Sequence, residues 1–187
     1  MKSNAPIRKF AAAAALIALP TLAAAHSYTY VEGGFLNRDY GRDDESGFRI
    51  AGSGDIVPNI ALIGEYADTG DVDQISGGGL FHTPVNSQLD FTAGATLEHI
   101  DVGSADDTGF GLRSGLRWQT ADGRFELAPE VRHIDVFDDS DTSLRLGALY
   151  GLTPALDVVG AVQAAGDDDR LEAGLRYNFV ARRMAAR

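Results

Sequence analysis

Apolar and polar residues alternate along most of this chain, in segments of about ten residues. Because successive side chains of a β-strand point to opposite faces, this period of two predicts strands rather than helices. The clearest case is 170–179, where one face carries Leu171, Ala173, Leu175, Tyr177 and Phe179. The chain is therefore expected to be all-β. The predicted strands are 28–37, 47–56, 60–67, 74–83, 89–98, 108–118, 124–136, 142–151, 156–165 and 170–179.

The connections between these strands fall into two alternating kinds. Four are short and contain turn residues, at 57–59, 84–87, 120–123 and 152–155. Five are longer and hold most of the 27 Asp and Glu residues, at 38–46, 68–73, 101–107, 137–141 and 166–169. Short turns that alternate with longer loops are typical of an antiparallel up-and-down barrel. We expect about ten strands, with eight as the alternative, and both termini on the side of the short turns.

The two faces of the strands separate a membrane barrel from a soluble one. One parity is apolar on almost every strand, and the other carries charged residues or glycine. A soluble β-sandwich or secreted lectin-like barrel, the alternative fold, would have to bury those charges or expose the aromatic residues. In a bilayer, strands of about 9–11 residues span the hydrocarbon, and the sheet closes so that no backbone group stays unpaired. Residues 26–179 are therefore predicted to form a transmembrane β-barrel with the charged parity inside.

Residues 1–25 have the layout of a secretory signal peptide. Three positive residues precede an apolar stretch at 10–19, and a run of alanines follows, with cleavage expected before His26. The apolar stretch is too short for a helix that crosses about 30 Å of hydrocarbon. Cleavage would remove both lysines of the chain. Export followed by a barrel predicts the cell outer membrane of a Gram-negative bacterium as the location, with 180–187 as a short basic tail.

The charged parity would place side chains of both signs in a narrow lumen. A buried charge without a partner is costly, and the planar guanidinium of arginine can bridge two carboxylates. We interpret the lumen as largely occluded by ion pairs, in a barrel with a structural, surface-interaction or adhesion role. A narrow cation-preferring channel is the alternative interpretation. The residues predicted to form this network are Glu32, Arg49, Glu65, Glu98, Arg113, Arg117, Glu126, Arg132, Arg145, Glu172 and Arg176.

The last strand, RLEAGLRYNF at 170–179, resembles the end of small outer-membrane barrels of the OmpA/OmpX kind. The segments YTYVEGGFLN at 28–37, QISGGGLFHTP at 74–84 and TGFGLRSGLR at 108–117 are similar to a xanthomonad-type family of small outer-membrane proteins. Members of that family were once described as secreted quorum factors or immune elicitors. The resemblance implies the barrel fold and the outer membrane but no activity. It also implies an insertion signal for the barrel-insertion machinery, formed by Leu175, Tyr177 and Phe179.

Composition and motifs argue against several other functions. The net charge of −11 argues against nucleic acid as a partner, since phosphate binding requires a basic surface. His99 and His133, each followed by an aspartate, are the candidates for catalysis, but no serine nucleophile has a matching spacing, so we predict no enzyme. No calcium-loop or phosphate-loop motif is present, and we expect no resident metal and no cofactor. The expected partners are outer-membrane lipid and lipopolysaccharide, the latter through divalent cations bound by the acidic loops.

Overall fold

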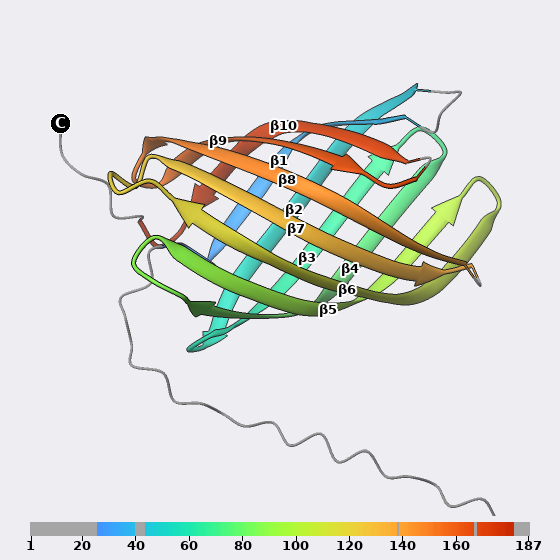
Figure 1. Cartoon of the computed structure of the whole chain (residues 1–187). Coiled ribbons are helices and arrows are strands. Elements are labelled where there is room, and N and C mark those ends of the chain that lie inside the picture. Colours follow the sequence, from blue (N-terminus) through green and yellow to red (C-terminus); the bar gives the residue numbers. More distant parts are fainter. Residues whose placement is uncertain (1–25, 40–43, 138, 167, 182–187) are drawn as a thin grey trace, which may run out of the picture.

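The computed structural model describes residues 26–39, 44–137, 139–166 and 168–181, which form one closed β-barrel (Figure 1). Each strand pairs antiparallel with its neighbours in sequence, and β1 pairs with β10 to close the sheet. The predicted all-β barrel of ten strands is confirmed, and the eight-strand alternative is wrong. The strands are β1 (Tyr30–Asp39), β2 (Asp44–Val57), β3 (Ile60–Thr69), β4 (Val72–Pro84), β5 (Leu89–Val102), β6 (Ala105–Gln119), β7 (Phe125–Val136), β8 (Asp139–Thr153), β9 (Leu156–Ala164) and β10 (Asp169–Asn178).

Two predicted segments fall wholly or mostly outside the described part of the chain. The signal peptide at 1–25 and tail residues 182–187 are not described, so these domain boundaries stay predictions. Within the described part, no helix is long and apolar enough to cross a membrane. Residues 26–29 are described and precede β1 without belonging to a strand.

The acidic connections are shorter than the sequence predicted. β5 continues to Val102 and β6 begins at Ala105, so residues 101–107, expected as a loop, form the end of a hairpin. β3 and β4 are joined in the same way across Gly70. Gly70 and Gly103 have φ angles of 58° and 63°, the left-handed conformation that tight hairpin turns use. The expected long loops were therefore wrong at these two hairpins, where acidic residues extend the strands instead. The expected loop 137–141 was also too long, because β7 ends at Val136 and β8 begins at Asp139.

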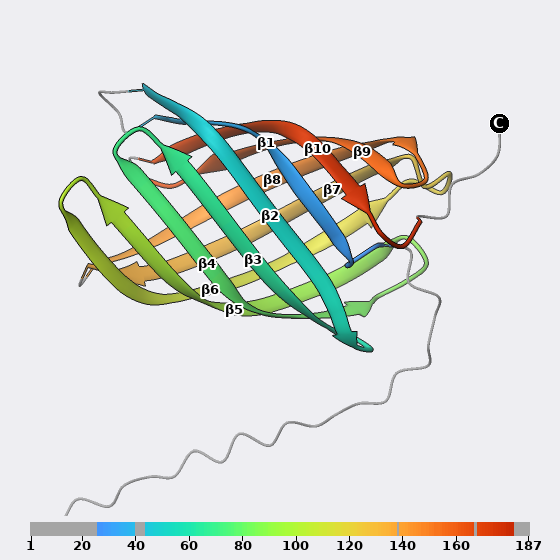
Figure 2. The ribbon, with the colours of Figure 1, turned by 180° about the vertical axis from the view of Figure 1, so that it is seen from behind.

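The barrel has two chemically different ends. The loop end carries the acidic hairpin ends and connections, and the turn end carries the connections at 58–59, 85–88, 120–124 and 154–155. Figures 1 and 2 show strands that run obliquely between these ends, as closure of a sheet into a barrel requires. The described chain ends both lie at the turn end, which follows from an even number of antiparallel strands.

The outer wall is apolar and the inner wall is polar, the reverse of a soluble protein. Large apolar side chains point outward on every strand, and Leu97 is 69% exposed while Phe35 is 52% exposed. The charged residues Asp90, Glu126 and Asp157 point inward and are 0% exposed. Exposed apolar surface on this scale is not tolerated in water and fits contact with lipid.

The β1–β10 seam that closes the barrel is packed too closely for side chains at one level. Gly34 faces Gly174 across the seam. A methyl group added at Gly34 would lie 2.2 Å from the carbonyl oxygen of Ala173, well inside van der Waals contact. Gly79, in the middle of β4, has open space at the corresponding position. Substitution of the two glycines therefore distinguishes two effects. Only Gly34 lacks room for a side chain, whereas both positions report the general effect of replacing glycine in a strand.

The seam predicts a site-specific loss of stability. Gly34→Ala should destabilise the refolded barrel by about 1–3 kcal/mol, because the backbone of β10 must move. Gly79→Ala should leave stability nearly unchanged or slightly improved. Urea unfolding in detergent micelles, followed by the fluorescence of Trp118, measures both variants. Equal midpoints for the two variants would show that the seam tolerates a side chain at position 34.

Candidate functional site

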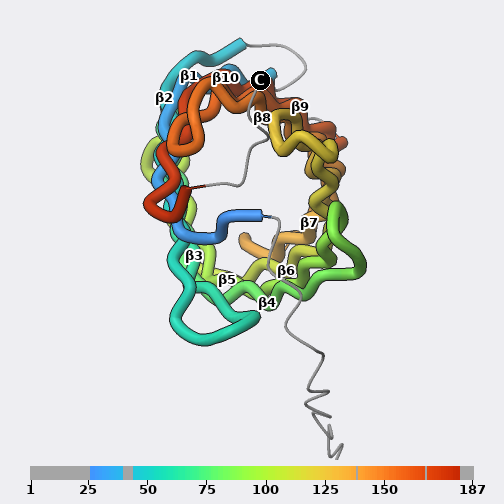
Figure 3. Tube along the Cα trace, turned by 90° about the vertical axis from the view of Figure 1, so that its left-hand side faces the viewer, coloured from blue at the N-terminus to red at the C-terminus, as the bar shows by residue number. Residues whose placement is uncertain are grey.

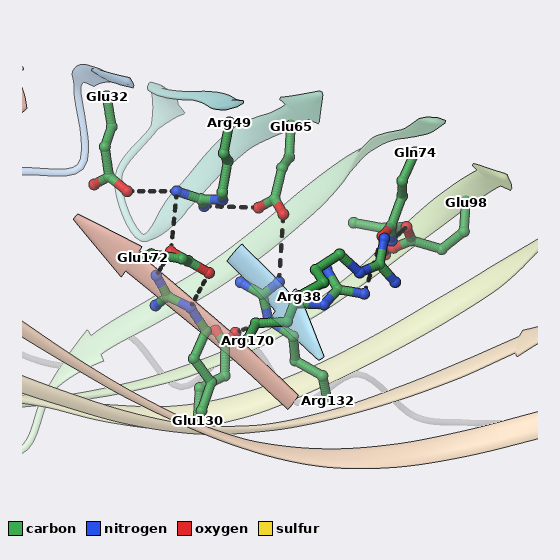
Figure 4. Close-up of polar contacts among 12 residues, drawn as sticks. Glu32, Arg38, Arg49, Glu65, Gln74, Glu98, Glu130, Arg132, Arg170 and Glu172 are labelled. Carbon is green, nitrogen blue, oxygen red and sulfur yellow. Dashed lines mark hydrogen bonds and ion pairs between the residues drawn. The ribbon is translucent and has the colours of Figure 1, made fainter. Parts of the chain in front are cut away.

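The lumen contains a central network of ion pairs that begins on the first three strands. Arg49 on β2 donates from Nη1 to Glu32 on β1 at 2.5 Å and from Nη2 to Glu65 on β3 at 2.7 Å. Its Nη1 also lies 3.6 Å from a carboxylate oxygen of Glu172 on β10. One guanidinium thus serves carboxylates from three other strands, which the planar fork of arginine allows. All four side chains point into the lumen (Figure 4).

The central network continues around and across the lumen. Arg176 on β10 donates to Glu32 from Nε at 2.8 Å and Nη2 at 2.5 Å. Arg145 on β8 donates to Glu172 from Nη2 at 2.5 Å. Arg132 on β7 pairs with Glu130 on its own strand and reaches across to Glu65 on β3 at 3.6 Å. Because β3 and β7 are four strands apart, the Arg132–Glu65 contact joins opposite walls.

A second group, the loop-end cluster, lies nearer the acidic connections. Arg38 donates from Nε and Nη2 to the two carboxylate oxygens of Asp168, at 3.1 and 2.7 Å. Arg170 donates to Asp168 at 2.9 Å and to the amide oxygen of Gln74 at 3.2 Å. Gln74 then donates to Glu98 at 3.1 Å. The chain of contacts runs from β1 and β10 to β4 and β5, so it too crosses the lumen (Figure 4).

A third group, the turn-end cluster, surrounds the residues that precede β1. Arg117 on β6 donates from Nε to Glu126 on β7 at 2.6 Å. The Tyr28 hydroxyl donates to Asp90 on β5 at 3.0 Å, and the Tyr28 ring stacks on His82 with centroids 3.6 Å apart. Tyr28 precedes β1, which begins at Tyr30. This cluster therefore places a residue from outside the strands inside the barrel.

The structure brings together most of the residues that the sequence assigned to the lumen network. Two of them differ from the expectation of arginine–carboxylate pairing. Glu98 accepts from Gln74 and from the Thr96 hydroxyl. Arg113 makes no ion pair within the described part of the chain, and it lines the cavities instead.

Sequence reasoning did not find Tyr28, Arg38 and Asp168. Arg38 and Asp168 were assigned to acidic loops, although the inward parity of Glu32 continues in steps of two to position 38. That continuation is the signal that could have identified Arg38. Tyr28 lies at the start of the predicted strand 28–37 and shares the inward parity of Glu32, which is the signal that could have identified it; in the structure it precedes β1.

The predicted insertion signal lies at the end of β10 on the outer wall. Leu175 and Tyr177 are about half exposed, and Phe179 follows the strand with its ring 5.3 Å from that of Tyr177. The outward placement leaves these side chains accessible to another protein or to lipid. Their role in insertion stays a prediction.

The two histidines considered for catalysis point outward on matching hairpins. The Nδ1 atom of His99 lies 2.8 Å from the Thr108 hydroxyl, and that of His133 lies 2.8 Å from the Thr142 hydroxyl. Cross-strand pairs of this kind hold the rings against the barrel wall. At the first hairpin, donor atoms of His99, Asp101 and Asp106 come within 4.8 Å of one another. The aspartates are exposed to water, and acidic groups of this kind are common on surfaces without a bound ion, so we assign the group no role.

Little space remains between these groups. A cavity of about 90 Å³ lies beside the central network and Tyr28. It can hold a few water molecules, whereas sites for small molecules usually measure about 300–1,000 Å³. Arg113 is one of the residues that line this cavity. The lumen is therefore a charged interior without an open ligand pocket in the described structure.

Comparison with known proteins bears on the fold. No protein-family model matches the chain, and no curated protein matches it in sequence. Among solved structures, a KdgM porin is similar with a TM-score of 0.51 and 11% identity, over 80% of this chain and 99% of that chain. The NanC porin is similar with a TM-score of 0.50 and 8% identity, over 80% of this chain and 100% of that chain. At such identities the likeness establishes the barrel fold alone, and the resemblance to the xanthomonad-type family stays a prediction.

The loop-end cluster predicts a dependence of stability on pH. Burial opposes ionisation of Asp168, but hydrogen bonds from Arg38 and the charge of Arg170 hold its pKa below the ordinary value. A carboxyl with a lowered pKa stabilises the fold above its unfolded-state pKa of about 3.9, and this contribution is lost as the pH falls further. Asp168→Asn should therefore destabilise the barrel by about 1–2 kcal/mol near neutral pH. The difference from wild type should shrink below about pH 4.

Urea midpoints of wild type and variant, measured at both pH values in the same detergent, test this prediction. Asp141→Asn is the matched control, because Asp141 is an exposed carboxylate at the same end of the barrel. The control should change stability little at either pH. A variant difference that stays constant with pH would contradict a role for the Asp168 charge.

Proposed function

We propose that this protein is an integral outer-membrane barrel with an occluded lumen, which acts through its surface rather than as an open pore. The apolar outer wall supports a position in lipid, because side chains such as Leu97 and Phe35 have no other environment that would bury them. Aromatic residues near both ends, including Phe48 and Trp118, are also exposed on the outer wall. Such residues are favoured where hydrocarbon meets the headgroups.

The observation that carries the proposal of an occluded lumen is contact across the lumen at three levels. Arg170 on β10 bonds Gln74 on β4 near the loop end. Arg132 on β7 pairs with Glu65 on β3 in the middle. Tyr28 bonds Asp90 on β5 near the turn end. A path along the barrel axis would have to pass all three contacts.

The loop end supports a role at the cell surface. Acidic residues face one another in register there, as in the pairs Asp68–Asp73 and Asp101–Asp106. Carboxylates are suitable ligands for Mg²⁺ and Ca²⁺, and these ions can bridge them to the anionic groups of lipopolysaccharide. The proposed partners are therefore lipopolysaccharide through divalent cations, together with the barrel-insertion machinery that reads the end of β10.

A narrow channel is the second candidate function. The cavity beside the central network supports it, because this cavity has room for a few water molecules, from which a path could begin. The solved porins of similar fold make the same alternative reasonable, and one of them is a KdgM porin in complex with disordered oligogalacturonate. Acidic residues at the loop end would concentrate cations at that mouth, and this preference would fade in high salt.

Location and orientation can be tested by cysteine labelling, since the chain contains no natural cysteine. Asp44→Cys and Asp106→Cys, at the loop end, should react with a membrane-impermeant maleimide on intact cells. Ala121→Cys, in an exposed turn, should react only after the outer membrane is permeabilised. Labelling at Ala121→Cys alone would reverse the orientation, and recovery of the protein in vesicle-free culture supernatant would overturn the membrane location.

Conduction separates the two candidate functions. In planar bilayers the wild-type protein should show a small conductance or none, because ion pairs fill the lumen. Arg132→Ala should create or raise the conductance by removing the contact between opposite walls. Arg124→Ala, in the connection between β6 and β7, is the control and should have no such effect. A large, stable wild-type conductance would favour the channel over the occluded barrel.

A further inference from the structure

The residues before β1 turn into the barrel instead of leaving it. His26, Ser27 and Tyr28 are 4%, 7% and 2% exposed. Figure 3 views the barrel from its turn end and shows this segment, in blue, crossing the opening. A chain segment that merely led from a signal peptide to a strand would have no reason to be buried. The segment 26–28 is therefore part of the interior, and we name it the N-terminal plug.

The plug is held by specific contacts on several strands. The Tyr28 ring lies between His82 on β4, stacked at 3.6 Å, and the Arg117 guanidinium on β6, centred 4.5 Å from the ring. Arg117 also donates from Nη1 to the backbone oxygen of Ser27 at 2.9 Å. Stacking, a cation–π contact and a charge-assisted hydrogen bond thus fix the course of the chain.

The first residue of the plug lies among buried carboxylates. The Nδ1 atom of His26 is 3.2 Å from a carboxylate oxygen of Asp90, and its Nε2 atom is 4.0 Å from one of Glu126. Both carboxylates are 0% exposed. Arg117 provides a positive charge at Glu126 and is also the cross-strand neighbour of Asp90. Asp90 accepts from the neutral Tyr28 hydroxyl, and its Oδ1 atom is buried with no hydrogen-bond partner in the described part of the chain.

We propose that the turn end of the lumen is a binding site for the chain's own processed N-terminus. Cleavage before His26 converts an uncharged amide into an α-ammonium on the buried residue whose imidazole lies 3.2 Å from Asp90. The ammonium supplies the positive charge and the hydrogen-bond donors that a buried carboxylate requires. Removal of the signal peptide therefore completes the plug and closes the turn end. The inference depends on the proposed export in one respect: the signal peptide must be cleaved before His26.

The composition of the processed chain makes the site measurable. Residues 26–187 contain no lysine, so the α-amine of His26 is the only primary amine. The chain is produced with His26 as its first residue by cleavage of a fusion, refolded in detergent micelles, and treated with an N-hydroxysuccinimide ester near neutral pH. Mass spectrometry follows acylation. The folded protein should react at least tenfold more slowly than the same chain in urea, and equal rates would overturn the proposal.

Two variants assign the protection to the carboxylate. Asp90→Asn keeps the side-chain shape but removes the charge, and it should restore much of the lost reactivity. Asp157→Asn is the matched control: Asp157 is also 0% exposed, lies on β9, and accepts a hydrogen bond from Asn178 at 2.8 Å. Its acylation rate should stay that of wild type. Acceleration by Asp157→Asn to the same extent would attribute protection to barrel stability and overturn the assigned site.

A chain that fails to fold cannot be mistaken for a result, because the unfolding midpoint from Trp118 fluorescence is measured for each variant. An extended chain with Gly-Ser before His26 gives an independent reading, since its amine lies outside the site. This amine should react rapidly while the barrel stays folded, and protection of it would contradict the proposal. The assay needs neither conduction nor a cell, so its failure is distinguishable from failure of the proposed function.

Discussion

Closure of the sheet between β1 and β10 is the constraint on which the rest of the structure depends. A sheet in lipid has no water for its edge groups, so it must pair its first strand with its last. Once the sheet is closed, each side chain faces either lipid or the lumen. The alternating sequence then determines the chemistry of both walls, and the close approach of Gly34 and Gly174 shows how tightly the seam itself is packed.

The charged inner wall follows from this constraint and creates a second one. Buried ion pairs add little net stability, because desolvation offsets much of their attraction, but removal of one partner is strongly destabilising. Glu32, Arg49 and Glu65 alternate in sign on three neighbouring strands. A slip of two residues would keep the parity of a strand but move such partners apart by about 6–7 Å. The network therefore favours one register among those that the apolar pattern alone permits.

The local pattern was readable from sequence because it depends on neighbours along the chain. Alternation located all ten strands and assigned the inward parity that contains Arg49 and Glu172. It did not predict the hairpin at 101–107, because acidic residues beyond the lipid no longer alternate with apolar ones while backbone pairing continues. It also could not choose Glu65 as a partner of Arg132. That contact depends on the circumference and stagger of the closed sheet, which no single strand encodes.

The burial of Tyr28 is a second example of a contact that the sequence pattern of one strand does not predict. Tyr28 shares the inward parity of Glu32, but alternation does not indicate that its side chain packs against His82, Asp90 and Arg117, which lie far away in sequence. Sequence patterns describe the wall of a barrel well. They describe poorly what fills it.

The contacts between opposite walls also have a mechanical meaning. A barrel one strand thick resembles a thin-walled tube, whose softest deformation is flattening of its circular cross-section into an oval. Contacts such as Arg132–Glu65 and Arg170–Gln74 act as struts across the diameter, and they resist both flattening and widening. Lateral pressure from the surrounding lipid would then be carried by the interior as well as by the wall, and opposite strands would move together rather than independently.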